Sequence, residues 1–585
     1  MLLQQLFDKY RCLKIQATTA TDTEIIEHPL FGTDSSELDI TGGIQPAIAE
    51  YGMEDIFVCL ESFITIAMYD RVSTLSVQND VDENGYPVYR IHMEWSNGRR
   101  HAYTIEKKIS FNIPQQHASV TDVRASQVSS RDTDSVPVIS KYRELGKNFC
   151  DAHQVSAPYV AGAMAGGIAS VEMVSAMAKQ SMLSFFGAGG LSLVQVEDAL
   201  QRLQSLSSEN LPWGCNLLHN IQEPEIEERT VDLLLQYGVR FVSASAFTGV
   251  TASIVRYRFA GIREENGRIV CPNALFAKLS HPSVAEQFLS PPARAIVERL
   301  VAEGVFTKQQ AEWAMRMPVA TDISVEADSG GHTDRRPLVV IVPYMQRLRH
   351  RLSTQFQYPE HTVRIGAAGG LGDPHSINAA FALGADYVLL GSIHQTTVEA
   401  NTSPLVKSML AEASITDFAM GAAPDMFEQG AQVQVLSKGS MYAARSMKLY
   451  GLYRQYNSIE EIPATEIAKL EKQIFQQSIA DVWKETATYW QRDPKQLLRA
   501  EQSPKHKMAL IFRWYLGQSS RWARQGVVER QRDFQIWSGP SLGLCNQWIQ
   551  ETELADLSKR HIVALVHRLL DGVVALQNSR NGSPQ

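Results

Sequence analysis

Short apolar runs alternate with amphipathic segments between residues 155 and 400. Runs of this length suit strands that are buried on both faces, as in a parallel sheet. We interpret eight runs as strands: 159–164, 182–186, 212–218, 241–247, 274–280, 319–325, 363–368 and 387–390. Helical periodicity fills the intervals, as in 170–180 and 225–237. Eight strands alternating with helices predict an α/β fold, a (β/α)₈ TIM barrel over residues 155–400.

The sixth run leads into the sequence EADSGGH, which contains Gly330, Gly331 and His332. Two glycines at a strand end allow the backbone to approach a ligand closely. His332 would then stand at the carboxyl end of its strand, where barrels of this kind place their chemistry. The sequence therefore marks His332 as a candidate catalytic residue.

The seventh and eighth runs also end in small residues, Gly369 and Gly370 after one and Gly391 and Ser392 after the other. Exposed backbone N–H groups at such turns can hold a phosphate after the last two strands of a barrel. Turns without any ligand remain the alternative for either pair alone. Three glycine turns in chain order, one of them with a histidine, favour a binding site.

Three polar residues, Asn216, Ser245 and Lys278, interrupt apolar runs near their carboxyl ends. An unpaired polar group would be costly there, and a hydrogen-bonded core residue is the plain alternative for Ser245. The ammonium of Lys278 needs an anionic or hydrogen-bonding partner. Together the three suit a planar, phosphorylated cofactor.

The first 140 residues form a separate small α+β module to which we assign no chemistry. The turn sequences at Asn84-Gly85 and Asn97-Gly98 separate alternating segments over 86–95 and 100–109, which predicts an antiparallel meander. Residues 114–140 have the composition of a linker.

Residues 401–585 are expected to be mainly helical and to form a substrate or lid region. Helical patterns cover 404–412, 439–456, 464–488 and 554–578. One helix carries a mixed aromatic and basic set: Tyr442, Arg445, Lys448, Tyr450, Tyr453 and Arg454. This set is either a solvated face over core aromatics, or a lid or a docking surface for an acidic carrier protein. The basic segment 347–352 raises the same alternative.

Composition narrows the class of protein. The 585 residues carry a formal charge of 55 − 63 = −8, with 44% apolar and 20% charged residues, typical of a globular chain. Neither a nucleic-acid footprint nor a membrane-spanning run is present. The six cysteines show no disulfide or metal spacing, and we read no signal peptide, so a cytoplasmic location is expected.

From about residue 157 to 570, in order, a series of motifs resembles the PfaD-type enoyl reductases of polyunsaturated fatty acid and polyketide synthases. The motifs are YVAGAMAGGIAS, FFGAGGL, GCNLLHN, SASAF, FAKLS, EADSGGHTDRRP, AAGGLGDPHSINAAFALGADYVLLGS and SKGSMYAARSMKLYGLY. More distantly the barrel is similar to nitronate monooxygenases. Those proteins usually show EAGGH where this chain has DSGGH, which favours the reductase branch.

The resemblance implies an FMN-containing barrel that takes hydride from NADPH and reduces enoyl thioesters on acyl carrier protein domains, with a homodimer left open. His332 is the candidate proton donor, because imidazole can donate near neutral pH; orienting the flavin or closing a hydrogen-bond network is its alternative role. The residues implied to bind the cofactor are Ala163, Met164, Gly167, Asn216, Ser245, Lys278, Gly330, Gly331, Gly369, Gly370, Gly391 and Ser392. Two other functions remain open, a nitronate monooxygenase-like flavin oxidoreductase and a non-catalytic protein that only binds carrier proteins.

Overall fold

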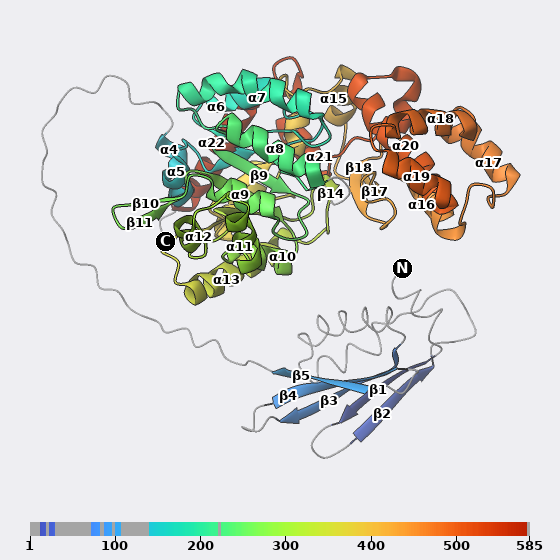
Figure 1. The fold of residues 1–585 in the computed structure, drawn as a ribbon, viewed down its shortest axis with the longest axis horizontal. Coiled ribbons are helices and arrows are strands. Elements are labelled where there is room, and N and C mark those ends of the chain that lie inside the picture. The colour runs from blue at the N-terminus through green and yellow to red at the C-terminus, as the bar shows by residue number, and fades with distance from the viewer. Residues whose placement is uncertain are drawn as a thin grey trace, which may run out of the picture. The chain divides into compact units, whose positions relative to one another are not determined.

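The computed structural model describes residues 140–219 and 224–581, together with five strands nearer the N-terminus. The chain divides into two compact units, residues 1–131 and 132–585 (Figure 1).

The first unit contains the predicted meander. Strands β3 (Val72–Val81), β4 (Pro87–Trp95) and β5 (Arg100–Glu106) pair antiparallel in chain order, which confirms the prediction. Strands β1 (Cys12–Thr18) and β2 (Thr23–Pro29) form a separate antiparallel pair. The two predicted Asn-Gly turns and the linker, except its last residue, lie outside the described residues.

The second unit is built on a closed barrel of parallel strands, which confirms the predicted fold class. Each of the eight runs forms one strand: β6 (Tyr159–Ala161), β7 (Leu183–Phe186), β8 (Gly214–Leu218), β9 (Phe241–Ser245), β12 (Ala274–Leu279), β13 (Asp322–Glu326), β15 (Arg364–Ala368) and β16 (Tyr387–Leu390). The barrel closes where β16 pairs with β6.

Helices surround the barrel, and side chains cap several of them at their amino ends. They are α6 (Val171–Ala178), α7 (Leu193–Ser208), α8 (Pro224–Gln236), α9 (Ala252–Phe259), α10 (Pro282–Leu289), α11 (Arg294–Ala302), α12 (Lys308–Ala314), α13 (Leu338–Phe356) and α14 (Pro374–Ala382). Ser192 and Thr307 form capping boxes with Gln195 and Gln310. The segment 256–270, between the fourth and fifth barrel strands, contains the end of α9 and a hairpin of β10 (Arg263–Glu265) and β11 (Arg268–Val270).

The amino end of the barrel is closed by helix α5 (Lys147–His153). Phe149 is fully buried and stacks on Tyr387, with ring centroids 4.5 Å apart. His153 contacts the carboxylate of Asp322 at 3.0 Å, and Arg364 binds the same carboxylate at 2.7 Å. The buried carboxylate of Asp322 is thus paired with His153 and Arg364, as a charge in a low-dielectric interior requires.

The region after residue 400 is mainly helical, as expected, but several of its elements differ from those that the sequence patterns predict. The expected helix 464–488 breaks into α17 (Ala464–Leu470), the π-helical turn η2 (Glu471–Phe475) and α18 (Ile479–Trp490), since Gln476 adopts φ of 59° and Ser478 caps α18. Helix α22 spans Ile562–Asn581 and so begins later than expected. The patterns also missed α20 (Pro504–Gln525) and strands β17 (Phe418–Ala422) and β18 (Gln432–Leu436).

A second, small sheet joins this region to the barrel. Its order is β14-β18-β17, and β14 consists of Gly331–His332 (Figure 1). The C-terminal region also contains the helices α15 (Pro404–Ala411), α16 (Tyr442–Gln455), α19 (Pro494–Gln502) and α21 (Pro540–Ile549). No helix among the described residues is both long and apolar enough to cross a bilayer.

Candidate functional site

The three glycine turns predicted from the sequence adjoin one another at the carboxyl end of the barrel. A β-carbon added at Gly330 would lie 2.8 Å from Oγ of Ser392, and one at Gly369 would lie 2.7 Å from the carbonyl oxygen of Asp328. Gly391 is within 3.8 Å of the Met164 side chain by the same measure. The turns after β13, β15 and β16 and the loop after β6 therefore border one region.

Backbone donors at these turns are free to bind an anion. Within the described residues, the N–H groups of Gly369, Gly370 and Gly391 donate to no other group. Gly370 has φ of 70°, and no atom lies within 4 Å of the place a β-carbon would take. Adjacent unpaired N–H groups fit the phosphate of FMN, because they are strong donors and carry no side chain in the way.

Two buried side-chain oxygens near the same turns also lack partners. Oγ of Ser538 and Oε1 of Gln434 are buried and make no hydrogen bond in the described part of the chain. Ser538 lies directly against Gly330, since a β-carbon on that glycine would approach Cα of Ser538 to 2.6 Å. Buried polar oxygens normally have a partner, so these two fit a site that binds a polar group.

Asn216 and Ser245 form one hydrogen-bonded unit at the carboxyl ends of β8 and β9. Nδ2 of Asn216 donates to the Ser243 carbonyl at 2.8 Å and to Oγ of Ser245 at 3.1 Å. Since the hydroxyl of Ser245 has a hydrogen-bond partner, this contact agrees with the alternative that Ser245 is a hydrogen-bonded core residue. Oδ1 of Asn216 lies 3.4 Å from a β-carbon added at Gly189, in the turn after β7.

Lys278 has the anionic partner that its setting requires. Its Nζ lies 2.7 Å from Oε1 of Glu326, and the side chains are 28% and 14% exposed. Oγ of Ser329 donates to the same carboxylate oxygen at 2.8 Å. Neighbouring strands β12 and β13 thereby place a positive and a negative group side by side at the barrel's carboxyl end.

The loop after β6 folds back onto the loop after β7. Gly167, with φ of 75°, donates to the Gly187 carbonyl at 2.9 Å, and Gly166 donates to that of Gly189 at 2.7 Å. Arg524 of α20 donates to the Gly166 carbonyl at 3.1 Å. Ala163 and Met164 lie in this loop and are partly buried.

His332 is held by groups from the C-terminal region. Its Nε2 lies 3.0 Å from Oδ1 of Asp425, and its ring meets the Trp537 ring edge-on, with centroids 5.2 Å apart. The second histidine nearby, His394, is fully buried, and burial lowers the pKa of its imidazole to about 3. Nε2 of His394 lies 2.8 Å from the hydroxyl of Tyr159, whereas His332 is partly exposed.

Comparison with known proteins agrees with this arrangement. Residues 148–438 match the family described as nitronate monooxygenase, and residues 456–534 match the inserted helical domain of acyl-carrier-protein S-malonyltransferase. The crystal structure of the enoyl reductase domain of MlnA, from the macrolactin biosynthesis cluster of Bacillus amyloliquefaciens, is 36% identical. The match covers 76% of this chain and 99% of that one, with a TM-score of 0.72.

This chain belongs to the PfaD-type enoyl reductase family, within the nitronate monooxygenase-like barrels. Two further relatives agree. The polyketide biosynthesis protein PksE of Bacillus subtilis is 44% identical over 74% of this chain and 56% of its own length. One component of a polyunsaturated fatty acid synthase of a Thraustochytrium species is 43% identical over 70% of this chain and 28% of its own length. The chain thus spans about half the length or less of these two relatives.

Sequence reasoning missed several residues that contact His332 or the turn before it, among them Asp425, Gln434, Trp537 and Ser538. They come from the β17–β18 hairpin and from the segment before α21, where no glycine turn or polar residue in an apolar run marks them. Glu326 was visible in the motif EADSGGH but was not assigned. The sheet pairing of β14 with β18 brings residues of the C-terminal region to this turn.

The mixed aromatic and basic set on α16 is chiefly structural in this family member. Tyr442 is fully buried and donates to the Ala422 carbonyl at 2.7 Å. Arg445 pairs with the buried Asp533, and Lys448 pairs with Glu466 at 2.9 Å. These contacts favour the reading of a helix face that packs over core aromatics.

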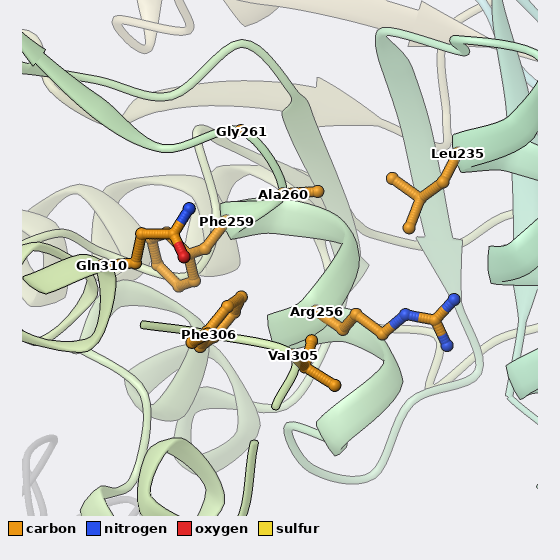
Figure 2. Close-up of a pocket in the computed structure, with 8 residues that line it drawn as sticks. All are labelled: Leu235, Arg256, Phe259, Ala260, Gly261, Val305, Phe306 and Gln310. Atoms are coloured by element: carbon orange, nitrogen blue, oxygen red, sulfur yellow. The ribbon is translucent and has the colours of Figure 1, made fainter. Parts of the chain in front are cut away.

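A depression of about 250 Å³ lies elsewhere, among the helices outside the barrel. Figure 2 shows its lining: Leu235, Arg256, Phe259, Ala260, Gly261, Val305, Phe306 and Gln310. These residues come from α8, α9, α12 and the loops beside α9 and α12, and none of them is a predicted site residue. The depression is therefore separate from the glycine turns.

Proposed function

We propose that this chain is a trans-acting enoyl reductase that reduces the α,β-double bond of enoyl thioesters on acyl carrier protein domains, with NADPH as hydride donor and FMN as cofactor. The observation that carries the proposal is the convergence of unpaired N–H groups at Gly369, Gly370 and Gly391 with the Asp425-bound His332. Relatives named for polyketide and polyunsaturated fatty acid synthases support the substrate class.

Each part of the site has a role in this proposal. The glycine N–H groups and Ser392 would hold the FMN phosphate, while Asn216, Ser245 and Lys278 would bind the ring and the ribityl chain. The loop of Ala163, Met164 and Gly167 would line the flavin, beside Gly330 and Gly331. Bound FMN would supply hydride to the β-carbon, and His332 would supply the proton for the α-carbon.

The outer face of α13 is the surface that we assign to the carrier protein. The helix begins shortly after His332 and exposes Val339, Val340 and Tyr344, followed by Arg347. Farther along, Arg349 pairs with Asp386 and Arg351 pairs with Glu286. An apolar strip followed by a basic residue suits an acidic partner.

An anaerobic titration tests the function. We expect NADPH to bleach a flavin absorbance band of the purified protein, and an enoyl thioester on a carrier protein to restore the band before oxygen is admitted. Recovery with oxygen alone would instead support a nitronate monooxygenase-like oxidoreductase. Failure to bind flavin at all would leave the non-catalytic carrier-binding role.

A substitution at His332 separates reduction of the flavin from turnover of the thioester. His332→Ala is expected to keep flavin and the bleaching by NADPH but to lose turnover of the thioester, because only the proton transfer needs the imidazole. His361→Ala, an exposed residue at the amino end of β15, is the matched control. Full turnover in His332→Ala would remove His332 from the mechanism.

A further inference from the structure

His332 lies between two side chains that the barrel itself does not supply. Asp425 binds its Nε2 at 3.0 Å, and Trp537 packs edge-on against its ring. Nδ1 of His332 has no partner among the described residues, and the side chain is 33% exposed. One ring nitrogen is therefore committed to a carboxylate, while the other is available to a ligand.

Asp425 is fixed in place by its neighbours in the β17–β18 hairpin. On one side, the Ala422 N–H donates to Oγ of Ser446 at 3.0 Å, and its carbonyl accepts from Tyr442. On the other side, Phe427 is fully buried in the core of the C-terminal region. The hairpin loop is anchored at both ends, so the carboxylate reaches His332 from a rigid support.

We propose that Asp425 is the positioning residue of the proton donor: its carboxylate holds His332 through Nε2, so that Nδ1 delivers the proton. The inference rests on the proposed enoyl reduction. Hydride addition at the β-carbon moves the double-bond electrons toward the thioester, giving an enolate. The α-carbon then forms a bond to the Nδ1 proton, which leaves neutral imidazole with its Nε2–H still donated to Asp425.

The charges around this pair support a carboxylate at Asp425. Burial raises the pKa of Asp425, but the hydrogen bond and charge of His332, with a backbone hydrogen bond and the charge of Arg513, together hold this pKa below its usual range. Arg513 adds a smaller attraction and is itself 3.3 Å from Glu428. Asp328, the other nearby carboxyl, accepts a hydrogen bond from Gln434 at 3.2 Å. A carboxylate bound to one ring nitrogen fixes which nitrogen is protonated when the ring is neutral.

Nitrogen NMR of isotope-labelled histidine in the full-length protein, without substrate, tests the positioning directly. His332→Gln identifies the resonances of His332. We expect the neutral ring of the native protein to carry its proton on Nε2 and Asp425→Asn to lose that preference, since an amide can also donate to Nε2. Asp417→Asn is the matched control. Asp417 lies just before β17, at the end away from Asp425, and its carboxylate accepts a hydrogen bond from the Ser414 N–H. If the neutral ring of His332 carries its proton on the same nitrogen in the native protein, in Asp425→Asn and in Asp417→Asn, the proposal is overturned.

Kinetics give the second measurement. Asp425→Asn is expected to lower kcat about 10- to 100-fold with KM for the thioester within about twofold, since general acid catalysis contributes at least that much. Asp425→Glu should restore part of the rate, because it returns a carboxylate to Nε2 of His332. A loss of rate that Asp425→Glu does not restore at all would mean a merely structural role. If the native protein reduces no thioester, the proposed function fails, whereas the NMR result still decides the role of Asp425.

Discussion

Gly331 pairs with Gln434 across an antiparallel ladder, and this pair ties the turn after β13 to the β17–β18 hairpin. The turn thus belongs to two sheets, since β13 is a barrel strand and β14 is an edge of the small sheet. The geometry of His332 depends on both. A barrel that ended near residue 400 would lack the strand that aligns this turn.

The side chain of Gln434 also stabilises this pairing of the turn after β13 with the β17–β18 hairpin. It donates to Asp328, whose pKa is raised by burial. We expect Gln434→Leu to destabilise the fold by about 1–3 kcal/mol, because it leaves a half-buried carboxylate without its donor. A raised folded-state pKa means that the ionised form is disfavoured, so the loss should be greater at pH 7 than near pH 4, where the carboxyl is protonated. Thermal unfolding of both proteins across this range checks the sign, and an equal loss at every pH would contradict it.

Gly370 offers a test of the phosphate site with a closely matched control. Its φ is 70° and nothing lies within 4 Å of an added β-carbon; Gly304, in the turn after α11, has φ of 72° and the same open space. Both Ala variants should therefore cost a similar ~1 kcal/mol of backbone strain. Only Gly370→Ala is expected to lose flavin, since the methyl group would occupy space at the free N–H groups. Equal flavin absorbance in the two purified variants would remove Gly370 from the site.

Lys278 is paired with Glu326, so its contribution to cofactor binding can be separated from its ion pair. Lys278→Ala is expected to weaken FMN binding about tenfold, ~1.4 kcal/mol, because the unpaired Glu326 carboxylate would then face an anionic cofactor. Glu326→Gln in the same chain should recover part of that loss. Titration of apoprotein with FMN measures both, and Lys469→Ala, which breaks a surface ion pair on α17, is the control. Unchanged affinity in Lys278→Ala would place Lys278 away from the flavin.

The barrel could be predicted from the sequence because each of its strands is buried on both faces and reads as an apolar run. The turn at Gly369 could be predicted for a related reason, since its φ of 86° is a local conformation that favours glycine. The partner of His332 could not be found this way. Asp425 lies 93 residues away along the chain, in a hairpin whose strands show no clean alternation. For the same reason, the contact of His153 with Asp322 at the amino end of the barrel could not be predicted, because these residues are 169 positions apart along the chain.

That contact predicts a large stability effect far from the chemistry. Asp322 is fully buried between His153 and Arg364; burial opposes its charge, yet these two partners hold its pKa well below the usual range. Asp322→Asn would leave the Arg364 guanidinium without its charge partner, and a loss of about 3–5 kcal/mol is expected. A depressed carboxyl pKa stabilises the native protein above pH 4, and the effect fades as pH falls through the folded-state value. Calorimetry at neutral pH measures the loss, and Glu360→Gln, at an exposed ion pair, should show almost none.

The carrier surface on α13 can be tested by reversing one charge. Arg347 is exposed and makes no ion pair within the described residues, so Arg347→Glu should leave the fold intact. We expect it to raise KM for a carrier-bound enoyl thioester several-fold, since like charges would then meet across the contact. KM for the free pantetheine thioester should stay the same, because that substrate does not reach α13. Arg316→Glu, exposed between α12 and β13 at the opposite end of the barrel, serves as the control. A rise for both substrates would indicate damage to the site, and no rise for either would exclude this face of α13 as the carrier contact.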